Sequence, residues 1–238
     1  MVKFADDSYI IIPSSNVESR QREVEHAEQW AVKNNLRVNV AKYMEVVFFD
    51  KRSRKSGKII PPPPLPGIKR VNTVKILGVT LSDDLSVDDH VHAVISSAAQ
   101  TLHALRVLRG HGMDDAALQS VFRAVVVSKL QYASCAWWGF STAADRQRIN
   151  AFIRRCTRCG FVPADLPQFE EICRLADETL FRSIISNHNH VLFHLLPPQS
   201  IASQNYNLRR RFHNLQIPAR VNYLNDCNFV TRMLYANL

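Results

Sequence analysis

The stretch KFADDSYIII, residues Lys3–Ile12, places two adjacent carboxylates between two apolar or aromatic runs. Aspartate suits tight turns, whereas tyrosine and isoleucine favour strands. The pattern therefore predicts a β-hairpin with Asp6 and Asp7 at its turn. Carboxylates this close repel each other unless a cation lies between them, and Mg²⁺ prefers such hard oxygen ligands. A solvated surface turn without a metal is the simpler alternative.

The residues after this hairpin predict a helix, a turn and a strand. Pro13–Asn16 ends the second strand and offers helix caps. Apolar residues then recur at helical spacing, which predicts an amphipathic helix ending near Asn34–Asn35 and facing inward through Val17, Val24, Ala27 and Ala31. The segment LRVNVAK, Leu36–Lys42, leads into EVVFF at 45–49, a composition typical of a strand.

A basic, proline-rich segment separates this region from the next strand. Residues 51–75 carry eight basic side chains and no acidic one, and they include four consecutive prolines at 61–64. Such a run can neither form a helix nor pair inside a sheet, so 51–73 is predicted to be an extended loop. The loop would either contact a nucleic-acid backbone or be a disordered insertion. The strand VKILGVTL, Val74–Leu81, follows, and Gly78 at its turn permits close approach of backbone or phosphate.

Three amphipathic segments with short links predict a small helical bundle after residue 82. Gly110 and Gly112 end the first helix, and Asp114 caps the second. The third is predicted at 143–158. The expected core-facing residues are Val91, Val94, Ile95, Ala98, Leu102 and Leu105 in the first helix, Leu118, Val121, Phe122 and Val125 in the second, and Ile149, Phe152, Ile153 and Cys156 in the third.

The third helix carries positive charge opposite its apolar stripe, at Arg146, Arg148, Arg154, Arg155 and Arg158. Like charges on one helix repel unless they are solvated or paired with phosphates, so this face is either a nucleic-acid surface or a plain solvated one. The aromatic residues before this helix, Tyr132, Trp137 and Trp138, would either stack on bases or, more often for such residues, lock helices together.

Residues 165–238 predict further helices with weaker signals. One or two helices are expected before Pro197–Pro198, with Ile172, Leu175, Leu180, Ile184 and Ile185 on their apolar side. A basic cluster at 209–211 and a terminal helix at about 226–235 follow. These patterns together predict an α+β fold with regions at 1–82, 83–164 and 165–238.

Several motifs occur in an order that resembles the reverse transcriptases of non-LTR (LINE-type) retrotransposons. The resemblance spans about residues 2–160, and its motifs are the Ala-Asp-Asp turn at Asp6 and Asp7, Asn39-x-x-Lys42, Lys75-x-Leu77-Gly78-Val79, and Tyr132-Ala133 before Trp137. The resemblance implies the end of a polymerase palm at 1–82, a helical thumb at 83–164 and a C-terminal helical and basic region at 165–238. It departs from the family at Tyr43, where threonine is usual.

The resemblance also implies roles for single residues. Asp6 and Asp7 would hold Mg²⁺ for two-metal nucleotidyl transfer, with RNA as template and DNA as primer. Lys42 would neutralise the phosphates of the incoming nucleotide or protonate the departing pyrophosphate. Lys75, Leu77 and Gly78 would form the primer grip, and the nucleic-acid candidates on the helix at 143–158 are Arg148, Arg154, Arg155 and Arg158.

The family places its fingers and its first catalytic aspartate before the Asp-Asp turn. The chain is therefore expected to be a carboxy-terminal fragment that is inactive alone, because the residues of such a site act as a unit. Two alternatives belong to other classes: a non-catalytic basic module that binds nucleic acid, and a decayed reading frame without function. The strands that normally pair with the palm strands would be missing, which would leave sheet edges unpaired, so the helical bundle should be the most stable part of the chain.

Charge and cysteine content narrow the choice of partner and compartment. A net charge of +9 favours a polyanion such as nucleic acid. No apolar run approaches the length of a membrane span and no signal peptide is apparent, so the protein is expected in the nucleus or cytoplasm, not secreted, with reduced thiols. A zinc site is not expected, because no second pair of close ligands has zinc-finger spacing. The candidate ligands are Cys156, Cys159, Cys173, His188, His190 and His194.

Overall fold

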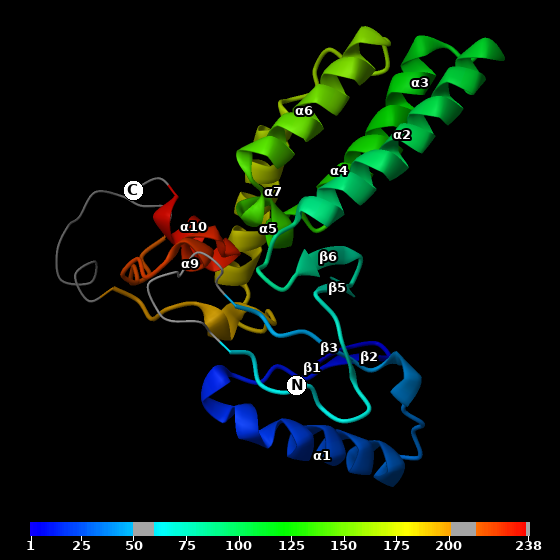
Figure 1. The fold of residues 1–238 in the computed structure, drawn as a ribbon. Coiled ribbons are helices and arrows are strands. Elements are labelled where there is room, and N and C mark those ends of the chain that lie inside the picture. The colour runs from blue at the N-terminus through cyan, green and yellow to red at the C-terminus, as the bar shows by residue number, and fades with distance from the viewer. Residues whose placement is uncertain (50–59, 201–212, 237–238) are drawn as a thin grey trace. The chain divides into compact units, whose positions relative to one another are not determined.

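The computed structural model describes residues 1–49, 60–200 and 213–236 as helices and short strands (Figure 1). The chain divides into two compact units, Met1–Val74 and Lys75–Leu238. The predicted mixture of helix and sheet is confirmed, with helices dominant in the second unit. The regions expected at 83–164 and 165–238 both lie in that second unit. No helix among the described residues has both the length and the apolar character needed to cross a membrane.

The first unit contains short strands and one long helix. Strands β1 (Val2–Phe4) and β2 (Asp7–Tyr9) pair antiparallel and confirm the predicted hairpin. A 3-10 turn, η1 (Ser14–Ser19), leads into α1 (Arg20–Lys33), which ends where the sequence predicted. A second 3-10 turn, η2 (Val40–Lys42), precedes β3 (Met44–Glu45), which pairs in parallel with β4 (Lys69–Arg70).

The strand predicted at 45–49 is wrong in its extent. Regular pairing stops at Glu45, and 46–49 have no regular structure. The partner strand β4 is only two residues long, so the backbone beyond Glu45 has no ladder to join.

Glu45 organises the first unit by charge. Its Oε1 atom accepts a hydrogen bond from Arg20 of α1 at 2.8 Å, and its Oε2 atom accepts from Arg70 of β4 at 2.7 Å. The same two arginines bind backbone oxygens of the proline segment, Arg20 at Pro63 and Arg70 at Pro62. All three charged side chains are mostly buried, with 12–22% of their surface exposed. One carboxylate therefore ties the helix, the parallel strands and the proline segment together.

The second unit begins with a hairpin and continues as a helical bundle. Its elements are β5 (Thr73–Ile76, which starts just before the unit boundary), β6 (Val79–Ser82), α2 (Asp88–Gly110), α3 (Asp115–Val121), η3 (Phe122–Val127), α4 (Ser128–Gln131), α5 (Ser134–Trp137), η4 (Trp138–Phe140), α6 (Ala143–Arg158), α7 (Phe169–Ser186), η5 (Phe193–Leu195), α9 (Tyr223–Cys227) and α10 (Phe229–Tyr235). The caps agree with the sequence: Asp114 accepts a hydrogen bond from the Ala117 amide at 2.9 Å. The predicted helix at 143–158 has the same bounds in the structure.

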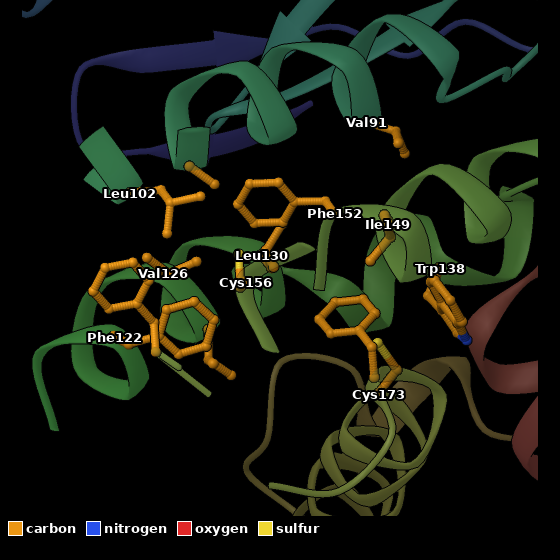
Figure 2. Packing of buried hydrophobic residues seen from close by; sticks show 14 of the residues in the cluster. Val91, Leu102, Phe122, Val126, Leu130, Trp138, Ile149, Phe152, Cys156 and Cys173 are labelled. Carbon is orange, nitrogen blue, oxygen red and sulfur yellow. The ribbon is translucent and has the colours of Figure 1, made fainter. Parts of the chain in front are cut away.

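The main core lies between the helices of the second unit (Figure 2). Side chains from α2, η3 and α6 meet there, and they include Leu102, Phe122 and Phe152. Trp138 and Cys173 extend this core toward α7. The predicted stripes of α2 and α6 are confirmed, because their apolar residues are buried or pack against this cluster.

The stripe predicted for the second helix is wrong at one position. Val125 is 39% exposed, whereas Val126 is fully buried. The cause is η3, a π-helical segment that follows α3 within the same continuous helix. A π turn holds more residues than an α turn, so the residue four positions after Phe122 returns to the core. The 3.6-residue spacing used for the prediction does not apply there.

Two predictions for the last third need correction. Leu175 on α7 is 44% exposed, because the buried residues of that helix recur at Phe169, Cys173, Asp177, Phe181 and Ile184, and Leu175 lies about half a turn from Cys173. The helix ends at Ser186, before the proline pair expected to stop it.

The predicted terminal helix is present as two short helices, α9 and α10, separated at Asn228, which caps α10. Phe181 of α7 packs with Met233 and Leu234 of α10 in a second, smaller core. The basic cluster at 209–211 lies outside the described residues.

Candidate functional site

The Asp6–Asp7 turn is a two-residue connection between β1 and β2. Phe4 pairs with Asp7, so Ala5 and Asp6 form the turn and Asp7 begins the second strand. Ala5 has a φ of 50°, a left-handed value that glycine adopts more readily. A non-glycine residue there costs on the order of 1–2 kcal/mol. Backbone strain of this kind clusters at functional sites, and here it immediately precedes the two carboxylates.

Both carboxylates of the turn face solvent. The Tyr9 hydroxyl donates a long hydrogen bond of 3.5 Å to Oδ2 of Asp7. The pair supplies hard oxygen ligands of the kind that Mg²⁺ prefers. Among the described residues no cluster of three or more His, Cys, Asp or Glu side chains is placed to hold a metal, so the turn offers two ligands and no third. A nearby pocket of about 400 Å³ lies between residues 10–13 and α1, and neither aspartate lines it.

Lys42 lies on η2 in the same unit and is exposed. Within the described part of the chain no hydrogen bond or ion pair joins it to Asp6 or Asp7. Its neighbour Tyr43 is directed toward α1, where Glu28 bonds its hydroxyl. Burial first, and then the charge and hydrogen bond of Glu28, raise the pKa of Tyr43. Tyr43 therefore links the η2 turn to α1.

The turn of the β5–β6 hairpin is covered by a side chain from the bundle. Leu77 and Gly78 have φ values of 46° and 90°, as in a type I′ turn. The Tyr132 hydroxyl donates a hydrogen bond of 3.0 Å to the Leu77 carbonyl. A Cβ atom on Gly78 would lie 3.1 Å from the Tyr132 ring. The ring of Tyr132 thus makes the close approach to the backbone that was expected at Gly78. Lys75 lies on strand β5 of the same hairpin.

The tryptophans that precede α6 pack inside the bundle. Trp137 and Trp138 are 1% and 5% exposed and contact each other edge to face, with ring centroids 5.8 Å apart. His90 of α2 contacts Trp137 at 5.2 Å, and its Nδ1 atom accepts a long bond of 3.5 Å from the Thr80 amide. Burial, and secondly the charge of Lys75, lower the pKa of His90. The packing alternative is therefore correct for both tryptophans.

The first two arginines of α6 are committed to acidic partners. Arg146 pairs with Glu170 at 3.0 Å, and its guanidinium lies 4.6 Å from the centre of the Trp138 ring. Arg148 pairs with Asp88 and with the buried Asp145. These bonds hold the pKa of Arg148 above its usual value, the hydrogen bond to Asp145 being the largest cause. Arg148 is thus paired with two carboxylates, and its role in binding nucleic acid stays a prediction.

A second group of arginines gathers where α2 and α6 both end, and we call it the arginine end: Arg106, Arg109, Arg154, Arg155 and Arg158. All five are exposed. Arg109 donates to the Cys159 carbonyl at 2.8 Å, and Arg106 donates to the Cys159 sulfur at 3.4 Å. The sequence analysis missed Arg106 and Arg109. Their only signal is basic residues in the last turns of an amphipathic helix, a common feature of helix C-termini.

The remaining basic candidates and the thiols add little to a site. Of the basic residues at 51–75, those at 51–58 lie outside the described residues, and Arg70 is bound to Glu45. All five cysteines are free. Burial raises the pKa of Cys156 to about 11, against the opposing charges of Arg155 and Arg106. Burial likewise raises the pKa of Cys173 to about 12. Both thiols are therefore protonated near neutral pH.

The candidate residues thus fall into two groups, one in each unit. The first unit holds the strained acidic turn with Lys42 on a separate 3-10 turn. The second holds the hairpin covered by Tyr132 and the arginine end. Comparison of the chain with protein-family models, with curated proteins and with solved structures finds no match.

Proposed function

We propose that the chain forms part of an RNA-directed DNA polymerase of the non-LTR retrotransposon type. The observation that carries the proposal is the Asp6–Asp7 pair, held at a two-residue hairpin turn behind a strained Ala5. The order of elements after it adds support: a helix, an Asn-x-x-Lys turn, a second tight hairpin and a helical bundle. In this proposal the first unit contributes to the palm and the second unit contains the thumb.

The acidic turn would contribute two carboxylates to the metal site of nucleotidyl transfer. Bound Mg²⁺ supplies charge neutralisation at the phosphate that is attacked and at the leaving oxygen. The chain's own part is to keep Asp6 in a tight turn and Asp7 next to it at the start of β2, with both side chains exposed to solvent. Lys42 would offer a proton to the departing pyrophosphate, as a positioned ammonium can.

The polypeptide of residues 1–238 is not expected to polymerise by itself. Two metal ions about 3.5–4 Å apart need more carboxylate ligands than one acidic turn provides. Among the described residues no third acidic, imidazole or thiol group joins the pair. We expect no template-dependent primer extension with Mg²⁺, and synthesis that disappears in the Asp6→Asn/Asp7→Asn variant would contradict this expectation.

Metal binding at the turn tests the proposal directly. Mn²⁺ is a paramagnetic substitute for Mg²⁺, and it should broaden the amide NMR signals of residues 4–9 before other signals. The Asp6→Asn/Asp7→Asn variant should lose this selective broadening.

The chain offers a matched control in a second acidic pair, Asp83 and Asp84. Asp84 already accepts hydrogen bonds from the Ser82 hydroxyl and the Ser86 amide. The Asp83→Asn/Asp84→Asn variant should therefore keep the broadening at residues 4–9. Equal broadening in wild type and the Asp6→Asn/Asp7→Asn variant would reject the metal site and with it the polymerase proposal.

A second candidate function is a non-catalytic module that binds nucleic acid. The arginine end favours it, because this group lies in a unit that does not contain the acidic turn. Binding of an RNA–DNA hybrid that is unchanged by Asp6→Asn/Asp7→Asn, together with a failed Mn²⁺ experiment, would select this function over the polymerase.

A further inference from the structure

The charges along α6 divide the helix into two halves with different surroundings. Arg146 and Arg148, in its first half, are bound to Glu170, Asp88 and Asp145. The arginines of its second half form no ion pair with an acidic side chain among the described residues. The same helix therefore neutralises its charge at one end and leaves it uncompensated at the other.

Helix α2 adds two arginines to that uncompensated end and holds them in place. The guanidinium of Arg109 lies 4.0 Å from the centre of the Phe161 ring, and it also bonds the Cys159 carbonyl. Phe161 is fully buried, so this ring is a fixed platform. Arg106 donates a hydrogen bond to the Cys159 sulfur at 3.4 Å, so both arginines of α2 contact the residue that ends α6.

Two simpler explanations account for part of this arrangement only. Arg109 satisfies a carbonyl at the end of α6 and complements the helix dipole. That role does not apply to Arg154 and Arg158, whose side chains form no hydrogen bond to a helix-end carbonyl in the described part of the chain. Asp114 and Asp115 begin α3 near the same end, but Asp114 caps its helix, and in the described structure neither forms an ion pair with the arginine end.

We infer that the arginine end is a clamp for the sugar–phosphate backbone of nucleic acid, formed jointly by the C-terminal ends of α2 and α6. The inference rests on the nucleic-acid partner proposed above and specifies where that partner binds. Guanidinium groups suit phosphate because they donate in a planar fork. The bonds of Arg106 and Arg109 to Cys159 hold the C-terminal ends of α2 and α6 together, so both helices present guanidinium groups at one place.

The clamp should not distinguish base sequence. Base stacking needs exposed rings, yet the rings next to these arginines are covered: Phe152 is 2% exposed and Phe161 is fully buried. The exposed ring of Tyr132 is bonded to the β5–β6 turn instead. Contacts to phosphate position a nucleic acid but carry no direct sequence information.

The test is the salt dependence of binding, measured by fluorescence anisotropy with a labelled RNA–DNA hybrid. Each phosphate contact contributes about −0.9 to the slope of log K against log salt. The Arg154→Gln/Arg158→Gln variant should therefore flatten the slope by about 1.8 relative to wild type. Between 50 and 200 mM salt, its affinity should fall about 12-fold less than that of wild type. Hybrids of different sequence should give the same values.

Arg174→Gln/Arg182→Gln is the matched control, since it also removes two exposed charges from a helix of the second unit. Its slope should equal that of wild type. Arg106→Lys/Arg109→Lys keeps the charge and should bind with a nearly unchanged slope, which separates phosphate contact from folding.

Three results would overturn the inference. The first is a wild-type slope in Arg154→Gln/Arg158→Gln, and the second is an equal flattening in the control. The third, failure of wild type to bind any hybrid at 50 mM salt, would reject the nucleic-acid partner itself and so the proposed function as well.

Discussion

Arg232 joins the end of the chain to the bundle, and its removal should destabilise the second unit strongly. Its guanidinium donates to Oδ2 of Asp177 at 2.5 Å, to the Cys135 carbonyl at 3.3 Å and to the Cys227 carbonyl at 3.2 Å. The Asp177 side chain is 2% exposed and that of Arg232 is 20% exposed. Asp177 also has a buried oxygen, Oδ1, without a hydrogen-bond partner. Among the described residues Arg232 is therefore the only cation paired with this carboxylate, which also hydrogen-bonds to the Cys135 side chain.

The expected loss follows from leaving that carboxylate unpaired. Breaking a buried ion pair by removing one partner costs about 3–5 kcal/mol. We expect Arg232→Gln to lower the free energy of unfolding of the second unit by roughly 3 kcal/mol, the lower value because the arginine is partly exposed. In Asp177→Asn/Arg232→Gln the buried charge is gone, so the double variant should be more stable than Arg232→Gln alone.

Urea unfolding at pH 7, followed by tryptophan fluorescence, measures this effect. Trp137 and Trp138 lie in the core of the second unit, and a Trp30→Phe background removes the tryptophan of the first unit. Arg174→Gln is the control, because Arg174 is half exposed and Glu178 keeps a second partner in Arg182, so stability should change little. A loss below about 1 kcal/mol for Arg232→Gln, or no recovery in the double variant, would refute the reasoning.

Three further predictions concern the second unit. Val126→Ala should cost about 2 kcal/mol whereas Val125→Ala should cost under about 0.5, because only the first fills the core; equal losses in urea unfolding would refute the π-helical register. Gly78→Ala should cost about 1–2 kcal/mol, because it adds a side chain at φ 90° against the Tyr132 ring, and Tyr132→Phe should cost about 1 kcal/mol for its hydrogen bond; a neutral Gly78→Ala would contradict this packing. The pKa of His90 is lowered in the folded chain, so below pH 6.5 the unfolded chain binds the proton more readily. The free energy of unfolding should therefore decrease as the pH decreases below 6.5. His90→Leu should flatten this pH dependence, and an unchanged slope would show that His90 is not its source.

Turn residues and apolar periodicity in the sequence correctly predicted elements whose formation depends on residues close in the chain. The hairpin at Asp6 and the helix at 143–158 appear as expected, because turn residues and apolar periodicity specify them. The π-helical segment was missed because periodicity assumes 3.6 residues in each turn. Glu45 was missed because an acidic residue beside an apolar run suggests a solvent-facing position, whereas its partners are 25 residues away on either side.

The candidate site shows the same division. The sequence predicted five charged arginines opposite the apolar stripe of α6; Arg154, Arg155 and Arg158 are exposed, whereas Arg146 and Arg148 are half-buried. It could not predict that Arg148 is neutralised, since its partner Asp88 lies 60 residues away. It also could not predict that Arg106 and Arg109 join the same surface, because that depends on how α2 and α6 pack. Long-range pairing therefore decides which arginines remain available.

The charge-based organisation of the first unit has a thermal consequence. Among its described residues Ala31 is the only buried apolar side chain, while Glu45 holds Arg20 and Arg70 in a mostly buried network. Heat capacity rises on unfolding in proportion to the apolar surface that becomes wet, so this unit should show a small increase. Its thermal unfolding should be broad. Cooling should lower its free energy of unfolding far less than that of a protein stabilised by a large hydrophobic core.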